Sequence, residues 1–305
     1  MKAKIIEKLL WKKFCSWLDS IEDIELKNLL LKNTIITGGS IVSYLLNETP
    51  NDFDIYFKNK ETTIKVAEYY VKKFKESYTY KSKYGHLVIG VIPSRDRVSI
   101  MVKSAGVISE DVDNSYQYFE MTPPDSPETS DYVEQLVTTL KDAKPGKTKE
   151  GEYRPVFLSS NAITLSNGIQ LITRFFGDAE TIHENFDFVH CMNYWTSWNR
   201  KLTLRPDALE AILTRQLIYN GSKYPICSII RTRKFIQRGW NCNAGQYFKM
   251  CMQVSKLNLM DTTVLQEQLL GVDVMYFAEL IRILNKTNPK DITDAYIIEL
   301  IDKIF

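Results

Sequence analysis

The hydrophobic pattern divides the chain into a region of mixed helices and strands and a region of helices. Near the N-terminus, apolar side chains recur every three or four residues, which predicts an amphipathic helix within residues 1–32. The segment TIKVAEYYVKKFKE (63–76) repeats this spacing. From about Asp178 onward the spacing is again helical, most clearly in residues 205–219, 246–257, 263–284 and 293–305.

Short runs of β-branched and aromatic residues between the first helices predict strands at 34–37, 52–57, 86–93 and 97–102. Two further runs, NAITL and IQLITRF, flank Ser166-Asn167-Gly168, and the Asn-Gly pair favours a hairpin turn with positive φ. We therefore expect an α/β (α+β) fold with a mixed sheet flanked by helices. The predicted core spans residues 1–177, with an insertion near 104–152, and a helical domain spans 178–305.

The composition is that of a globular protein and changes this picture little. The 305 residues are 44% hydrophobic and 25% charged, and no apolar run reaches 18 residues. We therefore expect no membrane partner. The five cysteines lack a CxxC spacing, which indicates a reducing compartment: the host cytoplasm, or a virion if the protein is viral. The three histidines are scattered along the sequence, and we assign them no role.

One stretch, residues 38–54, combines two kinds of candidate chemistry. Gly38, Gly39 and Ser40 follow an apolar run, and glycines let backbone N–H groups approach a phosphate closely. Asp52 and Asp54 stand on either side of a phenylalanine in a predicted strand, so both side chains should share one face, about 6.5–7 Å apart. Paired carboxylates suit hard cations such as Mg²⁺ or Mn²⁺. The stretch therefore predicts a site for an NTP and its metal.

This order of Gly-Gly-Ser, spacer and Asp-apolar-Asp-apolar resembles the signature of the DNA polymerase beta-like nucleotidyltransferase superfamily. The local form is most similar to the CCA-adding and poly(A) polymerase branch, whose helix reads Gly-Gly-x-Val-Arg-Asp-x-Leu-Leu-Gly. Both glycines and the two leucines of that pattern match, at positions 38, 39, 45 and 46, whereas Val42 and Ser43 replace its Arg-Asp pair. The resemblance implies a nucleotidyltransferase-type sheet, a triphosphate held by Gly38–Ser40 and metals held by Asp52 and Asp54.

The superfamily also places a third carboxylate on a later strand, and here this chain departs from it. The second arm of the predicted hairpin offers Gln170, a neutral amide that binds Mg²⁺ more weakly. Either the second metal is lost, or another acid such as Asp96 or Glu120 substitutes. The leading hypothesis is transfer of a nucleotide to a hydroxyl of nucleic acid or protein. The alternative is a degenerate nucleotidyltransferase fold that acts as a nucleic-acid-binding or virion structural protein.

The net charge of +2 hides a strong asymmetry along the chain. Residues 104–140 contain eight acidic residues and no Lys or Arg, whereas residues 200–249 contain ten Lys or Arg and two acids. Basic residues interleaved with aromatics suit an RNA or DNA backbone with stacked bases. The alternative interpretation is a solvated basic helix face. Four cations lie within eight residues and are the candidate contacts: Arg231, Arg233, Lys234 and Arg238.

Two phrases in the second half of the sequence add a weaker resemblance. FDFVHCMNYW (186–195) and GSKYPICSIIRTRKFIQRGW (221–240) are similar to uncharacterised proteins of large tailed phages. The high content of Lys, Ile and Asn is compatible with that origin. This resemblance implies no activity.

Overall fold

The computed structural model describes residues 1–77, 87–104, 151–158 and 161–259, together with residues 264, 268, 295, 298 and 299. The chain divides into two compact units. The first comprises residues 1–121, 139–184 and 191–208, and the second comprises residues 122–138, 185–190 and 209–305. The expected domain boundary at residues 177/178 stays a prediction.

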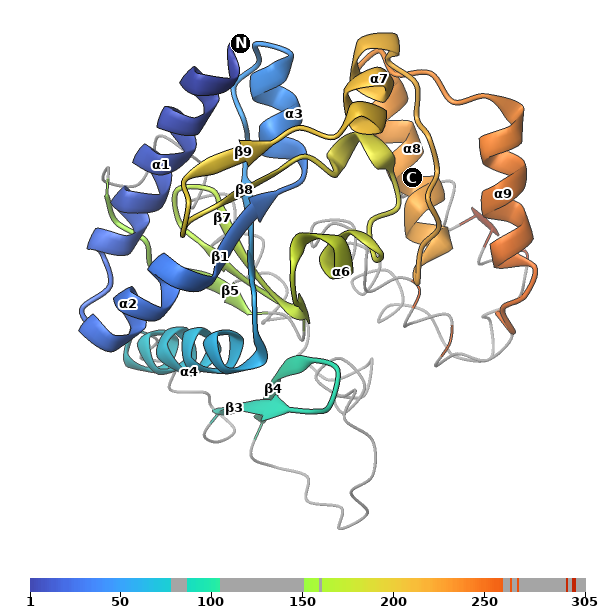
Figure 1. Cartoon of the computed structure of the whole chain (residues 1–305). Helices are drawn as coiled ribbons and strands as arrows, with labels where there is room; N and C mark the ends of the chain where they lie inside the picture. Colours follow the sequence, from blue (N-terminus) through green and yellow to red (C-terminus); the bar gives the residue numbers. More distant parts are fainter. Residues whose placement is uncertain are drawn as a thin grey trace. The chain divides into compact units, whose positions relative to one another are not determined.

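The first unit is built on a seven-stranded mixed sheet of order β5-β6-β7-β2-β1-β8-β9 (Figure 1). Strands β2 and β7 are parallel, and every other neighbouring pair in this sheet is antiparallel. The expected fold class, a mixed sheet flanked by helices, is confirmed. The strands are β1 (Thr34–Thr37), β2 (Phe53–Phe57), β5 (Pro155–Leu158), β6 (Ala162–Leu165), β7 (Ile169–Phe176), β8 (Tyr194–Thr196) and β9 (Lys201–Thr203).

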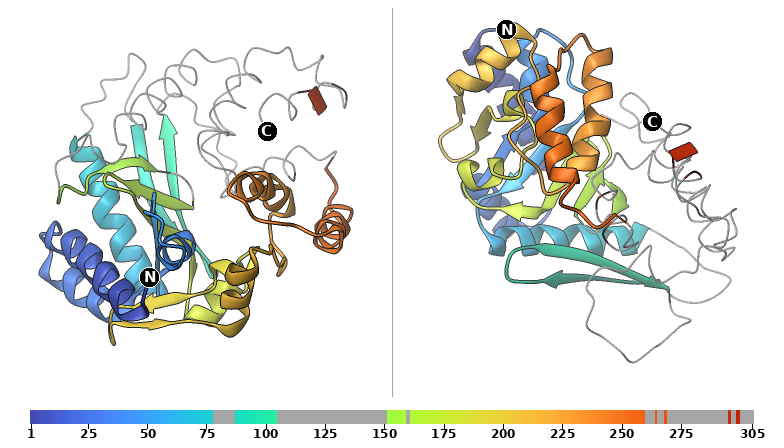
Figure 2. Two further views of the ribbon diagram at one scale, coloured as in Figure 1. Left: turned by 90° about the horizontal axis from the view of Figure 1, so that it is seen from above. Right: turned by 90° about the vertical axis from the view of Figure 1, so that its right-hand side faces the viewer.

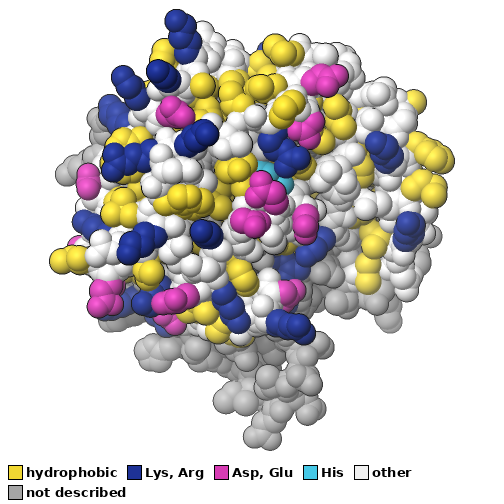
Figure 3. Space-filling view, in the orientation of Figure 1, with side chains coloured by type: hydrophobic (Ala, Val, Ile, Leu, Met, Phe, Trp, Pro, Cys, Tyr) yellow, Lys and Arg dark blue, Asp and Glu magenta, His cyan; other side chains and the backbone are white. Residues whose placement is uncertain are grey.

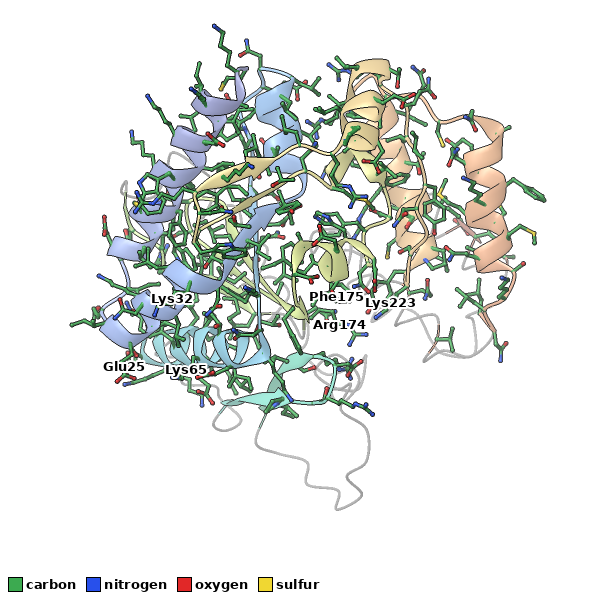
Figure 4. The ribbon with its side chains drawn as sticks, in the orientation of Figure 1. Glu25, Lys32, Lys65, Arg174, Phe175 and Lys223 are labelled. Carbon is green, nitrogen blue, oxygen red and sulfur yellow. The ribbon has the colours of Figure 1, made fainter. Side chains whose placement is uncertain are left out.

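Helices of the first unit bury one face of this sheet. Apolar residues of the predicted N-terminal helix join Trp195 and the apolar residues of β2 and β7 in a single core. Glu25 and Lys32 of α2 and Lys65 of α4 are exposed to solvent, as Figure 4 shows. The helices are α1 (Ala3–Asp19), α2 (Ile24–Asn33), α3 (Gly39–Leu45), α4 (Lys60–Ser77) and the short α6 (Ala179–His183).

Three details differ from the sequence pattern. The N-terminal segment is two helices, because the chain turns after Ser20 and Asp23 caps α2 by accepting from the N–H of Leu26. Strands β3 (Leu87–Pro93) and β4 (Val98–Ser104) pair only with each other among the described strands (Figure 2). Two short strands, β8 and β9, lie within the segment for which the pattern predicted helices.

The described part of the second unit is largely helical. Its helices include most of α7 (Pro206–Thr214), α8 (Pro225–Gln237) and α9 (Ala244–Val254). An aromatic cluster of Phe188, His190, Phe235 and Trp240 packs inside it. Exposed apolar side chains, Phe248 and Met252 among them, lie on α9 (Figure 3). No helix within the described ranges is long and apolar enough to cross a membrane.

Candidate nucleotide and metal site

The glycine turn and the second strand meet at Gly38 and Asp54. Gly38 has a φ of +87°, and a Cβ atom there would stand 2.8 Å from Oδ2 of Asp54. Both the backbone conformation and the close approach therefore require glycine. Thr37, the residue before the turn, is the cross-strand neighbour of Asp54. The structure thus brings the predicted phosphate turn against one of the two predicted metal ligands.

The two aspartates lie on either side of the first residue of β2. Phe53 and Ile55 are buried in the core, whereas Asp54 is half-buried and Asp52, just before the strand, is exposed. This alternation agrees with the period of a strand that has one buried face. The prediction that both carboxylates lie on the same face of the sheet stays a prediction. The strand register places Asp54 on the face opposite the core, but it does not include Asp52.

The hairpin turn fixes the chain beside Asp52. Gly168 accepts a hydrogen bond from the N–H of Phe53 (2.8 Å), and a Cβ atom on Gly168 would stand 2.7 Å from the carbonyl oxygen of Asn51. Asn167 and Gly168 have φ values of 62° and 69°, as the Asn-Gly pair predicts. Lys13 holds this turn from α1, because its Nζ donates to the carbonyl of Asn167 at 2.6 Å. Burial lowers the pKa of Lys13 to about 8.

Strand register aligns a row of polar residues across the sheet. In an antiparallel or parallel pair, side chains directly opposite each other share a face of the sheet. The core residues Ile36, Phe53, Leu171 and Trp195 belong to the other face. The row therefore forms a polar strip on the opposite face, with Asp54 half-buried near its centre and Thr37 fully buried beside it. From β9 to β6 the row consists of Thr203, Tyr194, Thr37, Asp54, Gln170 and Thr164.

Gln170 of β7 is the direct neighbour of Asp54 in this row. An amide oxygen therefore stands at the strand position where the resemblance implies a third carboxylate. Its role as a metal ligand stays a proposal. Asp96 is exposed in the turn between β3 and β4, where it accepts from the hydroxyl of Ser94 at 3.3 Å. Backbone hydrogen bonding lowers the pKa of Asp96. Glu120 lies outside the described residues.

A hydrogen-bond network that the sequence did not reveal supports the turn from the other side. The hydroxyl of Thr37 lies 2.9 Å from the carbonyl of Asn193, 3.2 Å from that of Cys191 and 2.9 Å from Nε2 of His183. Carbonyl oxygens only accept, so the single Thr37 proton can be donated to one of them. In that arrangement Nε2 of His183 carries a proton and donates it to the Thr37 hydroxyl, and in the other tautomer of His183 the hydroxyl donates to Nε2. Burial lowers the pKa of His183 to about 4, which keeps the ring neutral.

Of the three residues predicted to bind phosphate, Gly38 has its backbone N–H engaged within the protein, which leaves Gly39 and Ser40 as the candidate donors. The N–H of Gly38 already donates to the carbonyl of Cys191 at 3.1 Å. Gly39 and Ser40 belong to the first turn of α3, where backbone N–H groups have no acceptor within the helix. Ser40 is 2% exposed, and its hydroxyl has no hydrogen-bond partner among the described residues. A buried hydroxyl of this kind normally has a partner, so a ligand oxygen would satisfy it.

The donor set around Asp54 fits one Mg²⁺ ion. Mg²⁺ is commonly bound by one or two carboxylates together with waters and substrate phosphates. Asp52 and Asp54 would supply the carboxylates, and the amide oxygen of Gln170 would be a weaker neutral ligand. No group of three or more His, Cys, Asp or Glu side chains suited to a metal occurs among the described residues.

The predicted nucleic-acid contacts lie in the second unit, on and just after α8. Arg233, Lys234 and Arg238 are exposed. Arg231 instead forms an ion pair with Asp187, at 2.6 Å between Nη1 and Oδ2. A second alternative, that these cations pair with the acidic residues of the predicted insertion, concerns residues that the structure does not describe. On the face seen in Figure 3, basic and acidic side chains are interspersed.

Fold and site together define an α/β protein with a polar row across its sheet, in which Asp54 lies beside a glycine turn. The chain belongs to the Gabija anti-defense 2 family, whose profile matches residues 8–215. It is 26% identical over 132 residues to Gabija anti-defense 2 of Bacillus phage SPbetaL7, covering 43% of this chain. The chain matches about a third (32%) of the length of that relative.

One solved structure was also found to be similar, the Thermotoga maritima CCA-adding enzyme complexed with tRNA. It has a TM-score of 0.37 and 13% sequence identity. The match covers 80% of this chain and 45% of that enzyme's chain.

Proposed function

We propose that this protein is a metal-dependent nucleotidyltransferase that counteracts the Gabija defence. The reaction moves a nucleoside monophosphate from an NTP to a hydroxyl of nucleic acid or protein, with release of pyrophosphate. The observation that supports this most is the contact between the Gly38 turn and the Asp54 carboxylate. A turn that must be glycine, directly beside a half-buried carboxylate in a polar row of the sheet, suits a triphosphate and its cation better than it suits packing.

One set of residues would bind the phosphate oxygens, and another would bind the cation. The N–H groups of Gly39 and Ser40 and the Ser40 hydroxyl donate to phosphate oxygens. Asp52 and Asp54 would hold the cation, and the amide oxygen of Gln170 on β7 would be a further ligand. When bound, Mg²⁺ or Mn²⁺ neutralises charge on the phosphates and lowers the pKa of the acceptor hydroxyl. Thr37 and His183 keep the turn in place, and the His183 ring stays neutral.

The proposal is tested by incubating the protein with each of the four α-labelled NTPs, Mg²⁺ or Mn²⁺, and total RNA or host protein as acceptor. We expect label to join one class of acceptor. Asp52→Asn and Asp54→Asn should each abolish transfer, because each loses a metal-binding charge with little change in volume. Asp19→Asn, an exposed acid of α1, is the matched control and should retain activity. Full activity in the Asp52/Asp54 double variant would refute the assignment.

A second candidate function is favoured by Gln170. A neutral side chain beside Asp54 is expected of a nucleotidyltransferase fold that has lost catalysis and acts as a nucleic-acid-binding or virion structural protein. In that case the same assay gives no label with any acceptor, while the protein still binds nucleotide or nucleic acid. Binding without turnover would therefore favour this alternative over the enzyme.

A further inference from the structure

Tyr194 stands in the polar row of the sheet without a role in the site described so far. It belongs to β8 and lies directly opposite Thr37, which in turn lies opposite Asp54. The residue is half-buried, and its position in the row places it on the face that bears Asp54. Of the six residues in the row, Tyr194 alone is aromatic.

The ring is held in a defined orientation. The His183 ring packs on it edge to face, with 5.6 Å between centroids and 62° between planes. His183 is itself fixed by its hydrogen bond to Thr37. A ring that is already ordered loses little conformational freedom when a ligand stacks on it. The same network that supports the glycine turn therefore prepares an aromatic surface beside it.

We propose that Tyr194 is the stacking surface for the base of the donor nucleotide, an inference that rests on the proposed nucleotidyl transfer. Two strand spacings separate Tyr194 from Asp54, roughly 10 Å between backbones. A nucleoside triphosphate bridges such a gap when its phosphates meet Gly39 and Ser40 and its base reaches β8. Every base has a flat π face, so this contact holds the nucleotide while leaving base selection to other groups.

The test compares the binding of ATP, GTP, CTP and UTP with that of inorganic tripolyphosphate, each with Mg²⁺, by calorimetry. Tyr194→Leu removes the π face at similar volume and should weaken binding of the preferred NTP about 5- to 150-fold. Binding of tripolyphosphate should stay unchanged, because it has no base. Tyr194→Phe keeps the ring and should bind the NTP within about twofold of wild type.

Trp198→Leu is the matched control, since Trp198 is an exposed aromatic of the same unit that lies just after β8 and outside the row. It should leave NTP binding unchanged.

Equal NTP affinity in Tyr194→Leu and wild type overturns the stacking role while the proposed function stands. Equal loss for NTP and tripolyphosphate also overturns it, because that result indicates a distorted site. If Tyr194→Leu weakens binding of a single-stranded oligonucleotide but not of any NTP, the donor-base assignment is wrong. Failure of wild type to bind any NTP ends both proposals.

Discussion

At the scale of single residues, the site depends on one close approach. Gly38 can take its positive φ and admit the Asp54 carboxylate because it has no side chain. Ser40 adds a buried hydroxyl that lacks a partner among the described residues. These two features distinguish the turn from an ordinary strand-to-helix connection, where neither a close carboxylate nor an unsatisfied hydroxyl is needed.

Gly38→Ala should therefore lower stability and nucleotide binding more than the replacement of another glycine with a similar φ. Gly151 has a φ of +86° but nothing within 4 Å of its Cβ position, whereas Gly38 has Asp54 at 2.8 Å. Both variants pay backbone strain of about 1–3 kcal/mol. Only Gly38→Ala must also displace the carboxylate, so it should lower the free energy of unfolding further and abolish nucleotide binding. Denaturant unfolding and calorimetry measure both effects. Equal behaviour of the two variants would contradict the packing described for Asp54.

The burial of His190 should make the free energy of unfolding depend on pH. This residue is fully buried against Phe188, Phe235 and Trp240, and its ring nitrogens have no hydrogen-bond partner among the described residues. Burial lowers its pKa to about 4, with Asp187 opposing and Arg238 reinforcing the shift. The unfolded chain, with an ordinary pKa near 6.5, takes up the proton first as pH falls. Stability present above pH 6.5 is therefore lost between about pH 6.5 and 4, by about 3 kcal/mol.

His190→Phe removes that proton and should flatten this part of the stability curve. Urea unfolding at several pH values from 7.5 to 4.5 measures the slope. His183 remains in the variant and has the same sign, so the slope should shrink rather than vanish. A slope identical to that of wild type would show that His190 does not stay neutral in the folded protein.

At the scale of elements, the register between β2 and β7 determines which side chain lies beside Asp54, the candidate metal ligand. Because the strands are parallel and in register at this point, Gln170 rather than any acid stands beside Asp54. A one-residue slip would exchange it for a core residue. The neutral amide leaves two candidate carboxylates, which favours one bound cation over two.

Gln170→Asp should strengthen Mg²⁺ binding, because it restores a negative oxygen ligand next to Asp54. Thr164→Asp is the matched control: it adds the same charge in the same row, but on β6, one strand further from Asp54. Calorimetric titration with Mg²⁺ should show a clear gain in affinity for Gln170→Asp and a smaller one for Thr164→Asp. If Gln170→Asp binds Mg²⁺ no better than wild type, the cation does not lie at this point of the sheet.

Local patterns predicted much of this architecture. The alternation in DFDIYF predicted β2 and its buried face, the Asn-Gly pair predicted the β6–β7 hairpin, and helical spacing predicted α4. The strands β8 and β9 are three residues each, too short for alternation to be recognised. The Thr37–His183 hydrogen bond joins residues 146 positions apart. Such contacts depend on the folded topology, so Thr37, His183 and Tyr194 carried no signal in the sequence.

At the scale of the whole molecule, the second unit offers an exposed basic helix end. Arg233, Lys234 and Arg238 face solvent, whereas Arg231 is partly neutralised by Asp187. We propose that the exposed three contact an RNA or DNA phosphate backbone. Membership of an anti-defense family is compatible with such a partner, as it is with a protein partner.

Neutralising Arg233 and Lys234 together should flatten the salt dependence of nucleic-acid binding. Each lost phosphate contact reduces the slope of log K against log salt by about 0.7–0.9, so the pair should reduce it by about 1.4–1.8. Arg231→Gln should change the slope less and should lower stability, because it leaves Asp187 unpaired. Lys65→Gln, an exposed lysine of α4 in the first unit, is the control. Filter binding at several salt concentrations measures the slopes, and absence of binding at low salt would end the nucleic-acid proposal.

The central claim is that Asp54 and the glycine turn carry nucleotidyl transfer. Its most direct test follows α- and γ-labelled forms of the preferred NTP, with Mg²⁺ and acceptor, in wild type and in Asp54→Asn. We expect the wild type to attach the α-label to the acceptor and to release the γ-label as pyrophosphate, and Asp54→Asn to do neither. Attachment of the γ-label, or transfer of the α-label by Asp54→Asn at the wild-type rate, would contradict the central claim.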